Sequence, residues 1–447
     1  MKRKKIASIL IFALLLGCLA GCGGSREQEQ TVSVPEDYKG LMSYWKGKAV
    51  NKDITCWYTS DEDKDWLETV AEDFEKEYDI KVNLVYYDGV SLFDDLNQAN
   101  QKENGPDVYL AGNDQIELAV LSGMASRNTW LVDSFWQEYY PDVAKKAVTY
   151  KEKQYGYPVY FDTYCLVYDA NLLENAPASI EDILDFADEY EDTGSTKAIF
   201  RWDVADPYIN TMFLASYAEL FGENGDDGEA FKINNEKCIA AMEYFQSLSA
   251  YLWMNKNNIS HDTVKNRIKE GTLVLGLCKS DILSTLYEMQ NGKADTEEES
   301  DVKPVKETDD LDLQSEQETN YQISYVPSLT AELSSTTLST TYSAFVNPYG
   351  ADTNLGNLFA LYLSIGAAEK QYAGNGRLSV VNQKEKADSL QSVIYAQYLN
   401  SEPVPKVMVL GDYLSESGIA FDAIWSGGDV KEQLDRLQKA MEDKCGQ

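Results

Sequence analysis

The chain has 447 residues, of which 44% are hydrophobic, and a formal net charge of −35. This length favours two lobes over a single core. The charge argues against nucleic acid as a partner, because phosphate binding needs clustered Lys and Arg, and against the folded body lying on an anionic membrane. The one histidine, His261, excludes a His-rich zinc site and lies in what looks like a helix start, so we expect no metal site, no cofactor and no catalytic residue.

The first 22 residues have the pattern of a secretory signal. Basic residues stand near the start, an uninterrupted apolar run covers Ile6 to Leu16, and small residues precede Cys22. This predicts a signal peptide over residues 1–21. Leu19-Ala20-Gly21-Cys22 resembles a bacterial lipobox, in which cleavage before the cysteine leaves its thiol lipidated. The alternatives are an incidental Cys22 after an ordinary signal peptide and a poorer match ending at Cys18. We expect a lipid anchor on the extracytoplasmic face of the cell membrane.

A flexible tether is expected over residues 22–48, because its first part is small, polar and charged and buries too little to offset its ordering entropy. Foldable sequence begins near Asp53. The predicted elements that follow are strands at Ile54–Tyr58, Ile80–Tyr86 and Asp107–Leu110, with helices at Asp61–Tyr78 and Leu92–Gln101. Such alternation implies parallel pairing, and ligands of open sheets sit beyond the carboxyl ends of the strands, here residues 58–61, 88–89 and 112–114.

Strands and helices continue through the second half of the chain. Ser179 is a good N-cap, with Asp182 three residues on. Helices are further predicted at Asn210–Phe221, Glu236–Asn255, Asp262–Glu270, Asp281–Gln290, Leu355–Ile365 and Asp429–Met441, and strands at Cys165–Tyr168, Thr272–Cys278, Tyr321–Val326 and Tyr342–Val346.

One interval interrupts this order. Residues 294–319 hold eleven acids against two lysines and predict a mobile acidic insertion; a calcium loop is the alternative, although no DxDxDG-type spacing is present. The five cysteines after Cys22 are widely spaced and mostly within apolar runs. We interpret most of them as small buried hydrophobic residues, with one disulfide left open.

Four loose motifs in a fixed order give the chain a family resemblance. They are Ile54-Thr55-Cys56-Trp57 with Phe74 to Val82, Gly105-Pro106-Asp107-Val108-Tyr109, Tyr155-Gly156-Tyr157-Pro158 to Leu172, and Ala344-Phe345-Val346-Asn347-Pro348. The chain resembles the extracellular solute-binding lipoproteins of bacterial ABC importers, in the cluster that includes maltose- and oligosaccharide-binding proteins. The acidic insertion and Gly374 to Leu378 depart from the pattern.

The resemblance implies an α/β fold, a two-lobed periplasmic-binding-protein-like (type II) clamp in which each lobe is a mostly parallel sheet flanked by helices. One lobe would comprise residues 49–160 and 341–378, and the other residues 164–338 and 380–447. The crossings between them would fall near residues 160–162, 340–342 and 378–380, with the ligand in the cleft.

Aromatic rings and carboxylates in loops are the candidates for ligand binding. A pyranose has an apolar C–H face for ring stacking and a rim of hydroxyls for charged acceptors. The predicted ligand-binding residues are Trp57, Tyr58, Asp61, Asp114, Tyr160, Asp162, Trp202, Asp281, Tyr342 and Trp425. The alternatives are a core position for Trp57 and helix capping for Asp61, Asp114 and Asp281.

The resemblance implies a lipid-anchored, monomeric binding protein that captures a carbohydrate, an oligosaccharide in this cluster, and delivers it to the permease subunits of an ABC importer. It would not be an enzyme. A binder of another small polar or cationic solute, such as a polyamine, is the alternative because the predicted rim is acidic. A secreted glycoside hydrolase is a further alternative, but paired carboxylates carry little weight in a chain with 74 acids.

Overall fold

The computed structural model describes residues 35–190, 197–294, 319–382 and 390–446. The predicted signal peptide, Cys22, residues 22–34 of the expected tether and nearly all of the expected acidic insertion lie outside these ranges. Residues 36–447 form one compact unit. No helix among the described residues is both long enough and apolar enough to cross a membrane.

The first sheet begins with three parallel strands, as predicted. Strand β1 (Asp53–Tyr58) pairs with β2 (Lys81–Tyr86) on one side and β3 (Val108–Gly112) on the other. The connections are α3 (Lys64–Tyr78), which follows a short 3₁₀ turn η1 (Asp61–Asp63), and α4 (Leu92–Gln101). The buried face of α3 carries the predicted apolar stripe, so it packs onto the sheet and closes a strand–helix–strand crossover.

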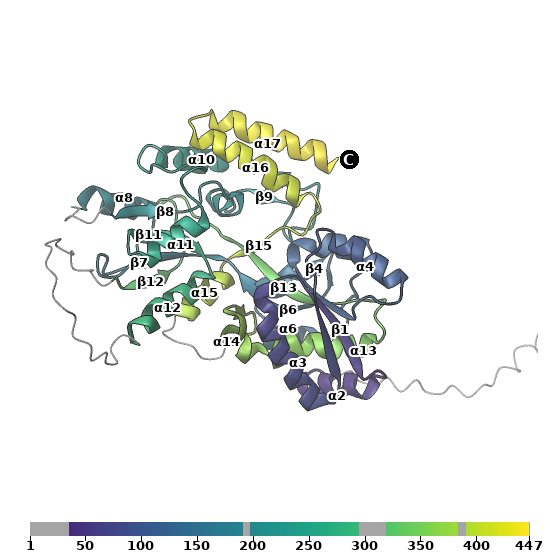
Figure 1. Cartoon of the computed structure of the whole chain (residues 1–447). Coiled ribbons are helices and arrows are strands. Elements are labelled where there is room, and N and C mark those ends of the chain that lie inside the picture. Colours follow the sequence, from purple (N-terminus) through teal and green to yellow (C-terminus); the bar gives the residue numbers. More distant parts are fainter. Residues whose placement is uncertain (1–34, 191–196, 295–318, 383–389, 447) are drawn as a thin grey trace, which may run out of the picture. The chain divides into compact units, whose positions relative to one another are not determined.

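Four further strands make this first sheet mixed rather than mostly parallel, which corrects the prediction. Its order is β14-β6-β13-β3-β1-β2, and β13 (Leu338–Val346) runs antiparallel to both β3 and β6 (Tyr157–Asp162). Strand β14 (Leu378–Ser379) is antiparallel to β6, and β15 (Glu402–Pro403) is parallel to β13. The chain leaves this sheet through β6 and returns through β13, so these two strands necessarily run in opposite directions (Figure 1).

The second sheet, of order β12-β7-β11-β8, is also mixed. Strand β7 (Tyr164–Asp169) is antiparallel to β11 (Leu273–Lys279) and to β12 (Tyr321–Ser324), whereas β8 (Ala198–Arg201) is parallel to β11. Only Thr163 separates β6 from β7, so the chain passes directly from one sheet to the other. Helix α8 (Ile180–Glu189) begins with the predicted Ser179–Asp182 capping box.

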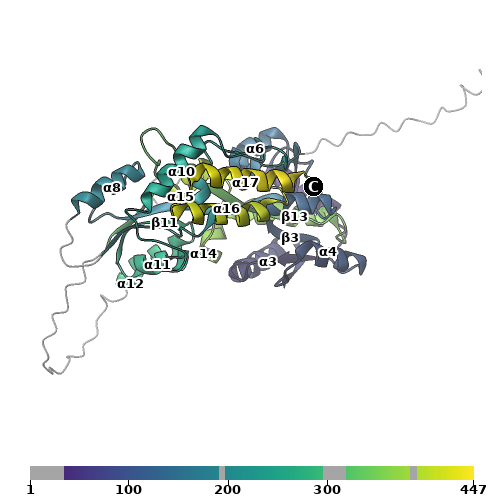
Figure 2. The same cartoon turned by 90° about the horizontal axis from the view of Figure 1, so that it is seen from above.

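Helices α10 (Glu236–Leu248), α16 (Leu410–Trp425) and α17 (Val430–Cys445) pack against one another beside this second sheet (Figures 1 and 2). Helix α16 was not predicted. The helix predicted over Asn210–Phe221 is wrong: α9 (Pro207–Asn210) ends after one turn, and positive φ angles at Phe221 and Gly222 turn the chain into a β9–β10 hairpin.

A helix replaces the second part of the expected tether. Helix α2 (Tyr38–Lys48) is capped by the Asp37 side chain and packs against α13 (Thr353–Leu361). Its buried residues, Leu41, Met42 and Trp45, recur at helical spacing and lie against the first lobe. The tether prediction is therefore wrong for residues 38–48, because distant apolar partners supply the burial that the local sequence lacks.

The remaining described elements connect these layers. The helical ones are η2 (Asn113–Gln115), α5 (Ile116–Leu121), α6 (Asp133–Tyr139), α7 (Asp142–Ala147), η3 (Thr211–Phe213), α11 (His261–Lys269), α12 (Ile282–Ala294), η4 (Tyr362–Gly366, a π-helix), η5 (Ala368–Lys370), α14 (Gln371–Asn375) and α15 (Leu390–Leu399); the strands are β4 (Thr149–Tyr150), β5 (Lys153–Gln154), β9 (Glu219–Leu220) and β10 (Phe231–Lys232). All five cysteines of the described residues are free, and four of them are buried.

Candidate functional site

A cavity of about 900 Å³ opens at the carboxyl ends of β1, β2 and β3. It lies along the rim expected from the strand order, since the loops that follow the three strands all contribute to its wall. Aromatic side chains and carboxylates dominate the functional groups of that wall. The aromatic ones are Tyr86, Tyr87, Phe93 and Tyr342, and the acids are Asp88, Asp94 and Asp114.

Tyr342 presents a ring to this cavity from the strand β13. Its ring stacks on that of Tyr160, with 4.7 Å between centroids and 25° between planes. Tyr160 is buried and donates its hydroxyl to Asp63 Oδ2 at 2.7 Å. Tyr160 thus supports the ring of Tyr342 from behind rather than facing the cavity. Burial raises the pKa of Tyr342 to about 12, so its hydroxyl is a neutral hydrogen-bond donor at physiological pH.

Arg377 lies beside this aromatic pair. Its guanidinium lies over the rings of Tyr160 and Tyr342, 5.3 and 5.9 Å from their centroids, and donates to Glu62 Oε2 at 2.5 Å. Asn375 completes the support by donating to Asp63 Oδ1 at 2.8 Å. The sequence analysis missed Arg377. Its signal was its place directly before β14, a predicted crossing segment.

Tyr208 of the second lobe lies near this wall but is not among the described residues that line the cavity. It follows Asp206, which caps α9, and burial raises the pKa of its hydroxyl, with Asp114 and Tyr342 adding to the shift. Asp114 and Tyr342 of the cavity wall thus lie near enough to Tyr208 to act on its pKa. Tyr208 was not among the predicted site residues, although it lies in the same chain break as Trp202, which was.

Asp206 is the centre of a polar cluster beneath Tyr208. Its Oδ2 accepts hydrogen bonds from Tyr164 Oη at 2.8 Å and pairs with His261 Nε2 at 2.5 Å. Burial acts to raise the pKa of Asp206, but the hydrogen bond and charge of His261, together with the hydrogen bonds from Tyr164 and the Tyr208 backbone, leave that pKa below its ordinary value. His261 therefore fixes the loop that carries Tyr208 and has no nucleophile beside it among these contacts.

The predicted residues of the first lobe lie in or near the cavity. Asp114 and Tyr342 line it. Trp57 is half-buried and stacks on the cavity-lining Tyr87, with 5.6 Å between centroids and 8° between planes. Tyr58 is buried against Tyr86, which also lines the cavity.

The other predicted positions near the crossing have different surroundings. Asp61 is exposed at the start of η1 and outside the cavity wall. Asp162 ends β6 and accepts a 2.5 Å hydrogen bond from Ser280 Oγ, so it ties the crossing segment to the end of β11. Asp281 is exposed and pairs with Lys265 at 2.9 Å.

Two predicted ligand-binding tryptophans are core residues instead. Trp202 is fully buried between Phe200, Phe213 and Trp425, and its Nε1 donates to Asn210 Oδ1 at 3.0 Å. Trp425 is also buried and donates to the carbonyl of Met254 at 2.7 Å. Neither ring has a free face for a ligand, because the helices α9, α10 and α16 close around them.

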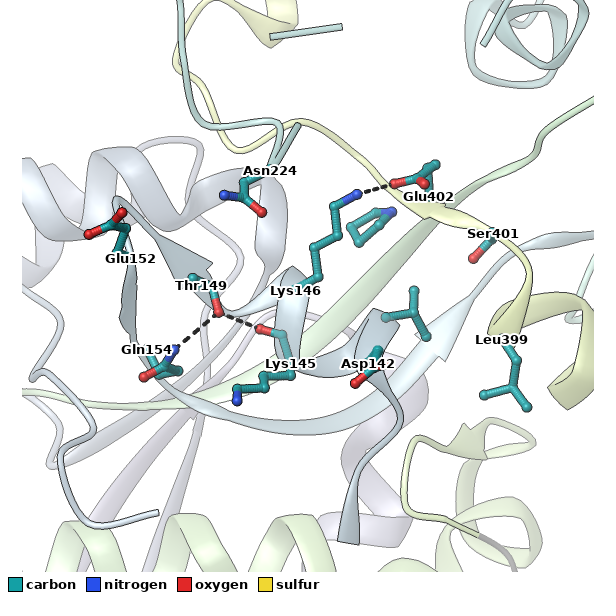
Figure 3. Close-up of a pocket in the computed structure, with 12 residues that line it drawn as sticks. Asp142, Lys145, Lys146, Thr149, Glu152, Gln154, Asn224, Leu399, Ser401 and Glu402 are labelled. Carbon is teal, nitrogen blue, oxygen red and sulfur yellow. Dashed lines mark hydrogen bonds and ion pairs between the residues drawn. The ribbon is translucent and has the colours of Figure 1, made fainter. Parts of the chain in front are cut away.

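A smaller hollow of about 470 Å³ lies between α7 and the segment 399–403 (Figure 3). Two pairs of its polar side chains interact: Lys146 pairs with Glu402 at 2.5 Å, and Gln154 donates to Thr149 Oγ1 at 3.5 Å. Among the described residues that line it there is no aromatic side chain. The larger cavity is therefore the better candidate for a ring-bearing solute.

Residues 69–352 match the family model described as bacterial extracellular solute-binding protein. This match covers more than half of the chain. The chain belongs to that family. It is a family of binding proteins, in agreement with the expectation of a binder rather than an enzyme.

Curated relatives of this solute-binding protein share part of its length. The maltodextrin-binding protein MdxE of Bacillus subtilis is 27% identical over 286 residues, which cover 60% of this chain and 61% of that protein. A maltooligosaccharide ABC transporter solute-binding lipoprotein of Streptococcus pneumoniae is 29% identical over 254 residues, 55% of each chain. The chain thus spans about 55–61% of the length of these relatives.

Solved structures confirm the two-lobed α/β fold. An extracellular solute-binding protein from Staphylococcus aureus, in complex with maltose, superposes with a TM-score of 0.72 at 17% identity and covers 89% of this chain and 98% of that one. A cyclo/maltodextrin-binding protein complexed with maltotetraose gives a TM-score of 0.71 at 17% identity, with coverage of 88% and 97%. At these identities the likeness establishes the fold alone.

Proposed function

We propose that this solute-binding protein captures a carbohydrate, an oligosaccharide, in the cavity at the ends of β1, β2 and β3 and delivers it to an ABC importer. The observation that carries the proposal is the pair of stacked rings at the cavity wall, Tyr342 on the buried Tyr160, which we call the tyrosine shelf. A sugar ring stacks on such a face, and the carboxylates beside it accept hydrogen bonds from the sugar hydroxyls.

The relatives support the same class of ligand. Besides the maltodextrin and maltooligosaccharide binders, they include a galactooligosaccharide-binding protein of Bacillus subtilis and a diacetylchitobiose-binding protein of Streptomyces coelicolor. Each of these four names specifies a ligand with more than one sugar unit. The name from Streptococcus pneumoniae also states an ABC transporter partner and a lipoprotein, which supports the importer and the anchor at Cys22.

Closure between the lobes would complete the site. We assign residues 49–160 and 341–378 to one lobe and residues 164–338 and 380–447 to the other, with helix α2 added to the first. Bacterial solute-binding proteins are an established example of hinge closure about a ligand. In this chain Tyr208 would supply the second-lobe side of the site, and Asp162 and Ser280 lie at the crossing about which the lobes would move.

The test is titration of the mature chain with maltooligosaccharides, galactooligosaccharides and diacetylchitobiose, followed by calorimetry and tryptophan fluorescence. We expect saturable binding of at least one, with the sugar recovered intact. Tyr342→Ala should weaken it by roughly tenfold or more, because stacking on a buried aromatic pair is lost. Tyr349→Ala, at a tyrosine that is 63% exposed and outside the cavity wall, is the matched control.

Hydrolysis of the sugar, or equal affinity of the Tyr342→Ala and Tyr349→Ala variants, would contradict the proposal. The anchor is tested separately by mass spectrometry of the membrane fraction. An acylated N-terminal Cys22 is expected in the natural chain, and Cys22→Ala should release the protein into the medium.

A further inference from the structure

The charges around the candidate cavity are strongly one-sided. Three carboxylates belong to its wall, and no Lys, Arg or His is among the described residues that line it. Asp88 and Asp94 are exposed at its outer edge, whereas Asp114 is half-buried at the carboxyl end of β3. Of the three acids, Asp114 is the one held deepest in the wall.

The carboxylate of Asp114 has a specific place in the backbone. It lies over Gly112, where an added Cβ would come within 2.3 Å of its Oδ1. Its Oδ2 accepts a hydrogen bond from Gln115 Nε2 at 2.7 Å, and burial raises its pKa. The described part of the chain gives Asp114 no ion pair, so the carboxylate has a neutral donor but no counterion.

Arg377, the cation beside the tyrosine shelf, already pairs with other groups and is not the counterion of Asp114. It pairs with Glu62 and lies over the two stacked tyrosines, and the other carboxylates that act on it are Asp162 and Asp63. Its charge is therefore matched by acids other than Asp114. The negative charge of the cavity wall remains uncompensated.

A ligand with a positive charge would provide the counterion that the carboxylates of this wall lack. A protonated amine on a sugar ring would form a charge-assisted hydrogen bond with the Asp114 carboxylate, which is stronger than the bond from a hydroxyl. A carboxylate or sulfate at the same place would meet like charge in a partly desolvated site. We propose that the cavity selects amine-bearing saccharides over neutral ones and rejects acidic ones, and that Asp114 determines this specificity. The proposal rests on the proposed function of the same cavity.

The experiment compares matched sugars on the mature chain. Two series of short oligomers, with gluco- and galacto-configured rings, each carry a 2-hydroxyl, a 2-ammonium, a 2-acetamido or a 6-carboxylate group. In the series that binds, the ammonium form should bind roughly tenfold tighter than the hydroxyl form in low salt, and the carboxylate form weakest. In about 0.5 M salt the preference should shrink, because exposed parts of the acidic wall are screened.

Asp114→Asn should bring the ratio of ammonium to hydroxyl affinity close to one. Asp79→Asn removes the same charge from the opposite edge of the sheet, before β2, and should leave that ratio unchanged. Asp79 has a left-handed backbone (φ 57°), a conformation that Asn also tolerates, so the control variant should fold.

The failures of the two proposals are distinguishable. If neutral sugars bind at least as tightly as their ammonium forms, the charge selection is wrong. If Asp114→Asn keeps the preference, the assignment of the selection to Asp114 is wrong. In both cases the carbohydrate function stands. If no sugar binds in either series, the carbohydrate function falls and the selection with it. Tighter binding of spermidine than of any sugar would overturn the selection too, because the amine would then be recognised without a ring.

Discussion

Trp202→Ala should unfold the second lobe at lower denaturant concentration, and its effect on ligand binding should be only the consequence of that instability. The ring is fully buried, with Phe200 at 5.2 Å and Trp425 at 5.6 Å between centroids. It also satisfies Asn210, whose own amide nitrogen donates to the carbonyl of Val204 at 2.7 Å. Removing the ring therefore leaves a cavity and a buried amide oxygen without its donor.

The expected cost follows from these two losses. Truncation of a buried Trp to Ala in a packed core costs about 3–5 kcal/mol. A buried acceptor left unpaired costs about 1–3 kcal/mol, part of which relaxation or an entering water recovers. We therefore expect the upper part of the first range, which is a large share of the ~5–15 kcal/mol that stabilises a typical domain.

Urea unfolding followed by far-UV circular dichroism measures this loss. Trp202→Phe keeps an aromatic ring but loses the N–H and part of the indole volume, so it should cost less than Trp202→Ala, with about 1–3 kcal/mol of that cost from the unpaired Asn210 oxygen. Trp253→Ala, at a tryptophan that is 82% exposed, should change stability by less than about 0.5 kcal/mol. If Trp202→Ala kept wild-type stability and lost its sugar affinity, the assignment of this ring to the core would be refuted.

Two further predictions concern burial in other regions. Lys406 is fully buried between the carbonyls of Lys146 and Asn224, and burial lowers its pKa from 10.5 to about 8. Because the unfolded chain then holds a proton that the native state has lost, the free energy of unfolding should rise between about pH 7.5 and 9.5 by about 2 kcal/mol more than in Lys406→Met. Parallel pH profiles of the two proteins would contradict this. Trp45→Ala should cost about 3–5 kcal/mol in urea unfolding because its ring packs edge-on against Trp130 and Tyr157, whereas a tryptophan in a tether would cost nothing.

The three parallel strands of the first sheet were predictable because their sequence pattern and their contacts are both local. A short apolar run predicted a strand at Ile54–Tyr58, and the structure has β1 at Asp53–Tyr58. The helix predicted at Leu92–Gln101 has those bounds. Once the strands alternate with helices, parallel pairing places their carboxyl ends together, which is why the cavity lies where the rim was expected.

Helix α2 could not be predicted because its partners are about 300 residues away. In sequence, three apolar residues stand among lysines, glycines and tyrosines. In the structure, Asp352 fixes the end of this segment by accepting hydrogen bonds from the backbone N–H groups of Val50 and Asn51, at 2.6 and 3.1 Å. Asp352 also caps α13, on which α2 packs. No window on the sequence around α2 contains that acid or that helix.

Trp202 and Tyr208 show why aromatic residues in a chain break do not reveal their own roles. The break was correctly recognised, and the larger ring was chosen as the ligand platform. The deciding features were the neighbours: Asn210 offers Trp202 an acceptor inside the core, whereas Asp206 caps α9 and holds the backbone from which Tyr208 projects. Both neighbours are polar residues, so the hydrophobic pattern carries no trace of them.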